Sequence, residues 1–146
     1  MSLSCFDHPY LSALLGHEEV AACFSPGEDL RAMLMFEKVL AEEQGRLGLI
    51  PAETVVVLVA AIDGFEANHQ DLSVQTARDG VVVPGLIRQI RKRLDEETRP
   101  YLHKGVTSQD VVDTSLVLRL KTVLRQIGNN LKLLDKAFAE LDETFG

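Results

Sequence analysis

The feature that most constrains this chain is a long proline-free stretch near its end. From Ser108 to Phe145 there is no proline, and Gly128 is the one glycine. Apolar residues recur there at alternating spacings of four and three, and Val117 and Asp113 continue the register backward. Such a heptad repeat predicts one long helix with an apolar seam. The seam consists of Leu120, Leu124, Ile127, Leu131, Leu134, Phe138, Leu141 and Phe145.

This predicted helix requires partners. A second apolar row (Val112, Leu116, Val123 and Leu133) makes the surface wider than a two-stranded coiled coil needs, which favours a multi-helix bundle. A helix over 108–145 would be roughly 55 Å long at about 1.5 Å per residue, and we predict no second helix of that length in the chain. We therefore expect other copies, or sequence outside this chain, to cover the seam, because an isolated monomer would expose a large apolar patch.

The preceding residues predict shorter helices separated by glycine and proline. Ser25-Pro26-Gly27-Glu28 has the pattern of a capping box and begins a helix that ends near Gly48. Further helices are expected from Pro51 to about Gly64, from about Asp71 to Gly80, and from Pro84 to a break at Pro100 and Gly105. We predict no β-sheet, since Pro84-Gly85 follows directly on the strand-like Val81-Val82-Val83.

These patterns predict an all-α fold. A small multi-helix N-terminal domain is expected over 1–106, followed over 107–146 by the first long helix of a central bundle. The remainder of that bundle and a C-terminal domain would lie outside the chain. A length of 146 residues with 46% hydrophobic content is compatible with a packed domain.

Composition also limits the classes of function. The net charge of −7 argues against nonspecific nucleic-acid binding, which needs basic surfaces. No apolar run is long enough to cross a bilayer, and the N-terminus does not resemble a signal peptide. The two cysteines, Cys5 and Cys23, form neither a disulfide framework nor a zinc-binding spacing. We expect a soluble cytoplasmic protein without a metal site.

Polar residues that could carry chemistry cluster just before the long helix, in the segment 103–114. Thr107 or Ser108 is placed to cap the helix, whose first-turn N–H groups and dipole favour an anion. Together with the Gln109 amide and a nearby His103, their hydroxyls would suit a carboxylate, and Gly105 would let the backbone approach it. The alternative is ordinary helix capping with the neighbouring charges in solvent.

The string His103-x-Gly105-x-Thr107-Ser108-Gln109-Asp110-x-x-Asp113-Thr114 resembles the first conserved segment of the fumarase/aspartase superfamily. Other stretches are similar to its 3-carboxy-cis,cis-muconate cycloisomerase branch, and the resemblance covers essentially the whole chain. These stretches are Phe6-Asp7-His8-Pro9 with Leu11 and Leu14, Phe24-Ser25, Leu30-Arg31-Ala32-Met33, Phe36-Glu37, Gly48-Leu49-Ile50-Pro51 and Asp79-Gly80-Val81-Val82-Val83-Pro84.

The resemblance implies the N-terminal portion of a three-domain helical enzyme whose central bundle forms a homotetramer through the 108–145 helix. The implied reaction, a step in protocatechuate (β-ketoadipate) catabolism, interconverts 3-carboxy-cis,cis-muconate, a small tricarboxylate, and its γ-carboxymuconolactone. In that reaction a carboxylate oxygen adds across a conjugated double bond while carbon receives a proton, and an enolate-like intermediate needs electrostatic stabilisation. No metal or organic cofactor is implied.

Motif correspondence implies substrate-binding roles for several residues of this chain. Thr107 and Ser108 would bind a substrate carboxylate with Gln109 adjacent, His103 would lie at the pocket edge, and the loop at Arg78 would approach the substrate. The superfamily's catalytic histidine and the serine of its mobile Gly-Ser-Ser loop belong to two later segments that this sequence does not contain. We therefore expect no catalytic residue within the chain and no activity from it alone, as active sites of this family combine segments from different subunits.

Two other functions remain as alternatives. One is a sister activity such as adenylosuccinate lyase, and the other is a non-catalytic helical oligomerisation module. The basic residues Arg88, Arg91, Lys92 and Arg93 predict either a solvated helix face or an anion site. The remaining histidines have no metal-ligand spacing.

Overall fold

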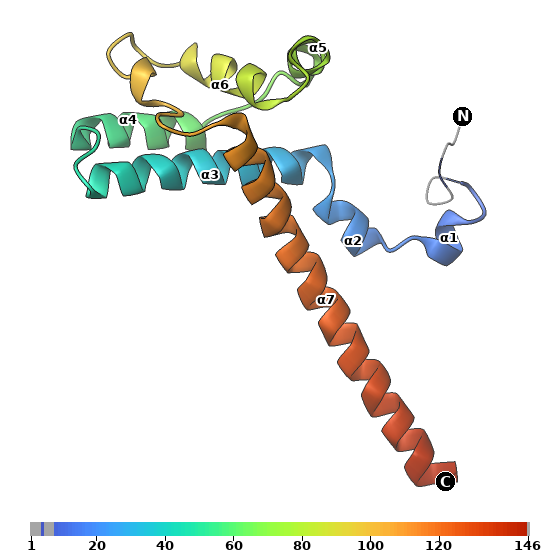
Figure 1. Cartoon of the computed structure of the whole chain (residues 1–146). Helices are drawn as coiled ribbons and strands as arrows, with labels where there is room; N and C mark the ends of the chain where they lie inside the picture. Colours follow the sequence, from blue (N-terminus) through green and yellow to red (C-terminus); the bar gives the residue numbers. More distant parts are fainter. Residues whose placement is uncertain (1–3, 5–7, 146) are drawn as a thin grey trace. The chain divides into compact units, whose positions relative to one another are not determined.

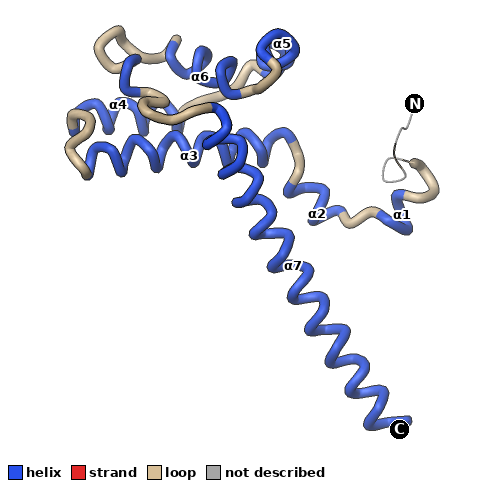
Figure 2. Tube along the Cα trace, in the orientation of Figure 1, coloured by secondary structure: helices blue, strands red, loops and turns tan. Residues whose placement is uncertain are grey.

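The computed structural model describes residue 4 and residues 8–145, so Cys5 and the Phe6-Asp7 part of the cycloisomerase-like N-terminal stretch lie outside the described residues. Figures 1 and 2 show helices joined by loops, and no strand occurs in the described part of the chain. The predicted all-α fold is therefore confirmed. In chain order the elements are α1 (Ser12–Leu15), α2 (Glu18–Cys23), α3 (Pro26–Arg46), α4 (Ala52–Asp63), α5 (His69–Asp79), α6 (Val83–Arg91), the 3₁₀ turn η1 (Arg99–Tyr101) and α7 (Ser108–Phe145).

The chain divides into two compact units. Residues 30–116 form one unit, and the residues up to 29 together with those from 117 onward form the other. Because this division is by spatial contact, it cuts through α3 and α7 and does not test the predicted sequence boundary at residue 106, which stays a prediction.

The unit over 30–116 contains a continuous apolar core. Within it α3 and α4 form an antiparallel pair, with Gly45 opposite Val55 at one end and Lys38 paired with Asp63 at 2.8 Å at the other. Helical apolar stripes supply most of the buried side chains, and the loops contribute Ile50, Leu94 and Leu102. The core consists of Met33, Ala41, Ile50, Leu58, Ile62, Leu72, Val83, Leu86, Ile87, Ile90, Leu94, Leu102 and Val111.

Helices α5 and α6 pack together and contribute Leu72 and four residues of α6 to this core (Figure 1). Helix α5 ends at Gly80, whose φ of 75° is the left-handed conformation that glycine adopts without steric cost. It begins at His69, two residues earlier than predicted, because the side chain of Asn68 accepts the N–H of Asp71 at 3.0 Å and caps the helix. Helix α6 begins at Val83, one residue before the proline that the sequence suggested.

Most of the basic residues on and after α6 interact with the rest of the fold. Arg88 binds Asp79 and Gln75, Arg91 donates to the Leu102 carbonyl, and Arg93 donates to the carbonyl of Gly64. Neither a solvated face nor an anion site describes these residues fully, because Arg88 joins α6 to α5 and the guanidinium groups of Arg91 and Arg93 hold loop carbonyls.

The second unit contains the exposed length of α7. Arg119 pairs with Asp29 at 2.8 Å and lies over the Phe24 ring, and Gln126 donates to Glu19 at 3.1 Å. The predicted long helix is confirmed from Ser108 to Phe145, and every residue of its apolar seam is exposed in the single chain. Among the described residues, no helix is long and apolar enough to cross a membrane.

Candidate functional site

The N-terminus of α7 carries a capping interaction between Thr107 and Asp110. Thr107 precedes the helix, and its backbone N–H and its hydroxyl both donate to one oxygen of Asp110, at 2.7 and 2.9 Å. This is the backward arm of a capping box, with an aspartate in the place of the usual Glu or Gln. These two bonds, the backbone one first, hold the pKa of Asp110 below its usual range.

This arrangement limits what Thr107 can offer to a ligand. A hydroxyl has one proton to donate, and that proton is used by Asp110. The Gln109 amide is likewise used within the helix, since it donates to Asp113 at 2.6 Å. Ser108, at the first helical position, is half-buried. The first-turn N–H groups have no partner within a helix, so Ser108 and these N–H groups form the anion-accepting part of the segment.

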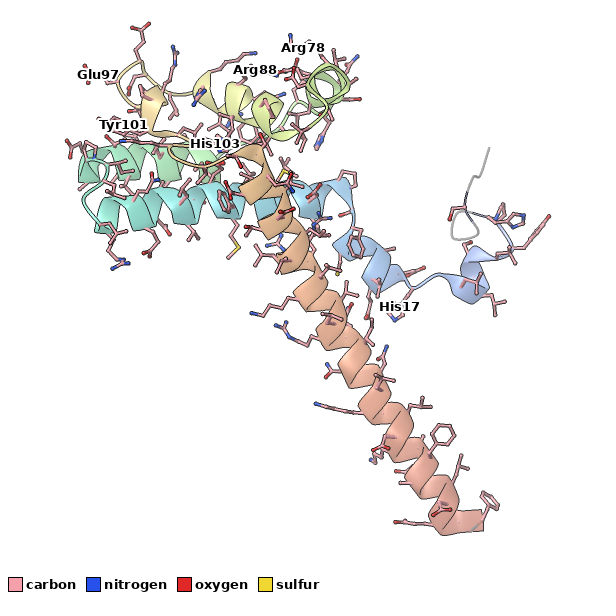
Figure 3. The ribbon with its side chains drawn as sticks, viewed as in Figure 1. His17, Arg78, Arg88, Glu97, Tyr101 and His103 are labelled. Carbon is pink, nitrogen blue, oxygen red and sulfur yellow. The ribbon has the colours of Figure 1, made fainter. Side chains whose placement is uncertain are left out.

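His103 lies in the loop between η1 and α7, where it meets α3 (Figure 3). Its Nδ1 is 2.6 Å from Oε1 of Glu37, a glutamate whose side chain is fully buried, while the His103 side chain is 16% exposed. The second carboxylate oxygen of Glu37 is buried and has no hydrogen-bond partner among the described residues. A buried carboxylate is costly unless it is paired, so the His103 contact is important for this part of the core.

Backbone contacts on both sides of His103 fix the loop. Arg91 donates to the carbonyl of Leu102 at 3.1 Å, and Gln44 donates to the carbonyl of Lys104 at 2.8 Å. His103 itself has a φ of 61°, a left-handed conformation that is uncommon for a residue with a side chain. Such a conformation persists where surrounding contacts over-determine it.

Arg78 lies apart from this loop, at the end of α5. Its guanidinium donates to Asp79 at 2.9 Å, and Arg88 binds the other oxygen of the same carboxylate. The pKa of Asp79 lies below its usual range because of these hydrogen bonds, from Arg78 first and Arg88 second. Figure 3 shows Arg78 and Arg88 together near α5 and His103 beside α3. The structure thus places four of the five predicted binding residues in one segment, 103–109, and the fifth elsewhere in the unit.

Sequence reasoning missed one residue of this site, Glu37. A signal for it was present, because Met33, Glu37 and Ala41 follow one another at spacings of four, which places an acidic residue in the buried row of α3. Among the residues that the structure describes, no group of three or more His, Cys, Asp or Glu side chains could hold a metal ion.

The chain is similar to cycloisomerases and lyases of known sequence and structure. No family model matches the chain. The chain is 32% identical over 125 residues to the 3-carboxy-cis,cis-muconate cycloisomerase of Pseudomonas aeruginosa, covering 84% of this chain and 27% of that enzyme. It is 32% identical over 130 residues to the adenylosuccinate lyase of Methanocaldococcus jannaschii, covering 84% and 28%. The crystal structure of β-carboxy-cis,cis-muconate cycloisomerase from Acinetobacter calcoaceticus sp. ADP1 matches with a TM-score of 0.75 and 26% identity, over 83% of this chain and 29% of that one.

The homologues of this chain are therefore enzymes of the fumarase/aspartase superfamily, which is the class that the helical fold and the 103–114 segment indicate. Within that class the predicted resemblance to 3-carboxy-cis,cis-muconate cycloisomerase is confirmed. The chain spans less than a third of the length of the cycloisomerases it matches.

Proposed function

We propose that this chain is the N-terminal portion of a 3-carboxy-cis,cis-muconate cycloisomerase and contributes one wall of its substrate pocket. The observation that carries the proposal is the segment from His103 to Gln109. It brings a histidine, a helix N-terminus and the Ser108 hydroxyl into one loop, which contacts Glu37 and Gln44 of α3. A helix N-terminus with hydroxyl donors suits a carboxylate, and the proposed substrate has three.

In this function the segment binds and orients the substrate. Ser108 and the first-turn N–H groups of α7 bind one substrate carboxylate, and His103 contacts the substrate through the face of its ring turned away from Glu37. Fixing the carboxylates supports ring closure because the attacking oxygen and the double bond must meet in a near-attack geometry. Proton transfer is assigned to segments outside this chain, so the chain alone is inactive and acts in a homo-oligomer.

A chimeric enzyme tests this function. The chain replaces the matching portion of the Pseudomonas aeruginosa cycloisomerase, and consumption of 3-carboxy-cis,cis-muconate is followed by ultraviolet absorbance. We expect turnover by the chimera and none by the chain alone. In the chimera, Ser108→Ala should lower kcat/KM by about 10- to 100-fold, because a hydrogen bond to a charged group contributes about 1.5–3 kcal/mol. Ser73→Ala, an exposed serine on α5, is the control and should leave kcat/KM unchanged.

Adenylosuccinate lyase is the second candidate, favoured by the 32% identity to the Methanocaldococcus jannaschii enzyme. The analogous chimera with that lyase separates the two candidates when each is given both substrates. Turnover of adenylosuccinate with no lactonisation in either background would exclude the cycloisomerase proposal. If both chimeras assemble correctly and neither turns over its substrate, the chain is a non-catalytic oligomerisation module.

A further inference from the structure

The pairing of Glu37 with His103 gives the histidine a defined chemical state, and neither the motif nor the comparisons assign any role to Glu37. The two residues are 66 positions apart, one on α3 and one in the loop before α7. Glu37 is fully buried and its one hydrogen-bonded oxygen contacts Nδ1 of His103 at 2.6 Å. At this distance the two side chains are hydrogen-bonded.

We propose that Glu37 is a positioning residue that keeps a proton on Nδ1 of His103 and leaves Nε2 as the atom available to a ligand. A neutral imidazole has one donor nitrogen and one acceptor nitrogen, and a hydrogen bond at one nitrogen decides the tautomer. In the proposed state Glu37 is an ionised carboxylate, which accepts hydrogen bonds and does not donate them, so Nδ1 is the donor of this bond. Among the described residues, Glu37 is the hydrogen-bond partner of the His103 ring, and it contacts Nδ1. No described residue forms a hydrogen bond with Nε2.

The surrounding structure holds the Glu37 side chain in place for its contact with His103. Its side chain is fully buried in α3, between Met33 and Ala41 of the same buried row, and its other oxygen has no partner. On the loop side, Arg91 and Gln44 fix the carbonyls before and after His103. Both ends of the contact are therefore held by packing and by backbone hydrogen bonds, as a preorganised binding group requires.

This pair also explains the uncommon backbone of His103. A φ of 61° is unfavourable for a residue with a Cβ, and in this loop it coincides with the ring's contact to the buried carboxylate. Gly105, two residues on, has a φ of 77° and provides the second left-handed residue of the turn. The two residues direct the chain from η1 into α7 with the histidine facing α3.

Long-range ¹H–¹⁵N NMR of the whole chain, with ¹⁵N-labelled histidine and no ligand, tests the proposal, since protonated and unprotonated ring nitrogens have well-separated shifts. We expect Nδ1 of His103 to show the shift of a protonated nitrogen in the wild type. Glu37→Gln keeps a carbonyl oxygen that can accept the same hydrogen bond and should preserve that signature. Glu37→Leu removes the acceptor and should move His103 toward the Nε2–H tautomer.

Glu42→Gln, an exposed glutamate of the same helix, is the matched control and should leave the His103 signals unchanged. An unprotonated Nδ1 in the wild type, or the same tautomer in the wild type and in Glu37→Leu, would overturn the proposal. The wild-type spectrum tests the proposed tautomer of His103 even if Glu37→Leu does not fold. The role of Nε2 toward substrate rests on the proposed function. The tautomer is measured in the chain without substrate, so a negative result here would leave the chimera assay unaffected, and a negative chimera assay would leave the tautomer unaffected.

Discussion

At the scale of single residues, the start of α7 uses its polar side chains in two distinct ways. Thr107 and Gln109 are bonded within the helix, to Asp110 and Asp113, and so stabilise the helix start. His103 is bonded across the core to Glu37. The segment is thus a capping motif at Thr107 and Gln109, whose donors are used within the chain, and a candidate binding site at His103 and Ser108.

The Thr107–Asp110 interaction makes helix capping dependent on pH. A carboxyl group whose pKa is lowered by folding contributes stability above its unfolded pKa of about 3.9, and this contribution is lost as the pH falls through the folded value. The pKa of Asp110 is lowered by the Thr107 N–H, then by its hydroxyl. We expect Asp110→Asn to lower the melting temperature at pH 7 and to have no effect once the pH is below the folded pKa.

Circular dichroism melts of the two proteins between pH 7 and pH 2 measure this difference. Asp135→Asn, an exposed aspartate on the same helix, serves as the control for the loss of one negative charge. A constant difference between the wild type and Asp110→Asn over the whole range would show that the carboxylate charge does not stabilise the helix start.

At the scale of helices, the antiparallel α3–α4 pair depends on a small residue at its contact. A Cβ at Gly45 would lie 2.3 Å from Cγ2 of Val55, whereas a Cβ at Gly128 of α7 would meet nothing within 4 Å. Both glycines are inside helices. Alanine at Gly128 therefore reports the intrinsic helix preference of alanine, whereas alanine at Gly45 also reports the effect of packing.

Alanine at these two glycines should therefore have opposite effects on the free energy of unfolding. Gly128→Ala should stabilise the chain by about 0.5–1 kcal/mol, because alanine loses less backbone entropy in a helix. Gly45→Ala should destabilise it by about 1–3 kcal/mol, since the added methyl group displaces Val55 from its contact. Urea denaturation of the two variants and the wild type measures both values. If Gly45→Ala increased the free energy of unfolding, the close contact between α3 and α4 at Gly45 would not contribute to stability.

At the scale of the whole molecule, the most prominent feature is the uncovered apolar seam of α7. Leu124 is 65% exposed and Phe138 61% exposed, on a helix of 38 residues. A contiguous apolar surface of this kind is typical of a protein–protein interface. We propose that copies of this chain, or of the longer enzyme that it matches, pack along this seam in a helical bundle.

Charged substitutions on the seam should separate the copies. We expect Leu124→Glu with Leu131→Glu to reduce the mass of the chain in solution to that of a monomer, because burying unpaired carboxylates in an apolar interface is costly. Light scattering with size exclusion measures the mass. Asn129→Glu, on the exposed opposite face of α7, should leave the mass of the assembly unchanged. A wild-type chain that is monomeric at micromolar concentration would contradict the proposed interface.

What the sequence determined by itself is the set of elements that arise from local rules. The heptad spacing from Leu120 to Phe145 predicted α7, and Ser25 accepts the Glu28 N–H at 3.3 Å, as the capping pattern required. Met33 and Met35 of α3 are 3% and 50% exposed, because residues two positions apart on a helix lie on different faces. Periodicity and capping involve residues within a few positions of one another, so the sequence is sufficient to predict them.

The contacts that these elements make with one another depend on tertiary packing and could not be predicted from local patterns. α1 and α2 are short and lack a strong periodic pattern, so sequence analysis did not predict them. The Glu37–His103 contact joins residues that local rules treat separately, and Arg78 lies apart from the segment with which it was grouped. Such pairings depend on the packing of α3, α6 and the loop before α7 against one core, and long-range packing is not contained in the spacing of neighbouring residues.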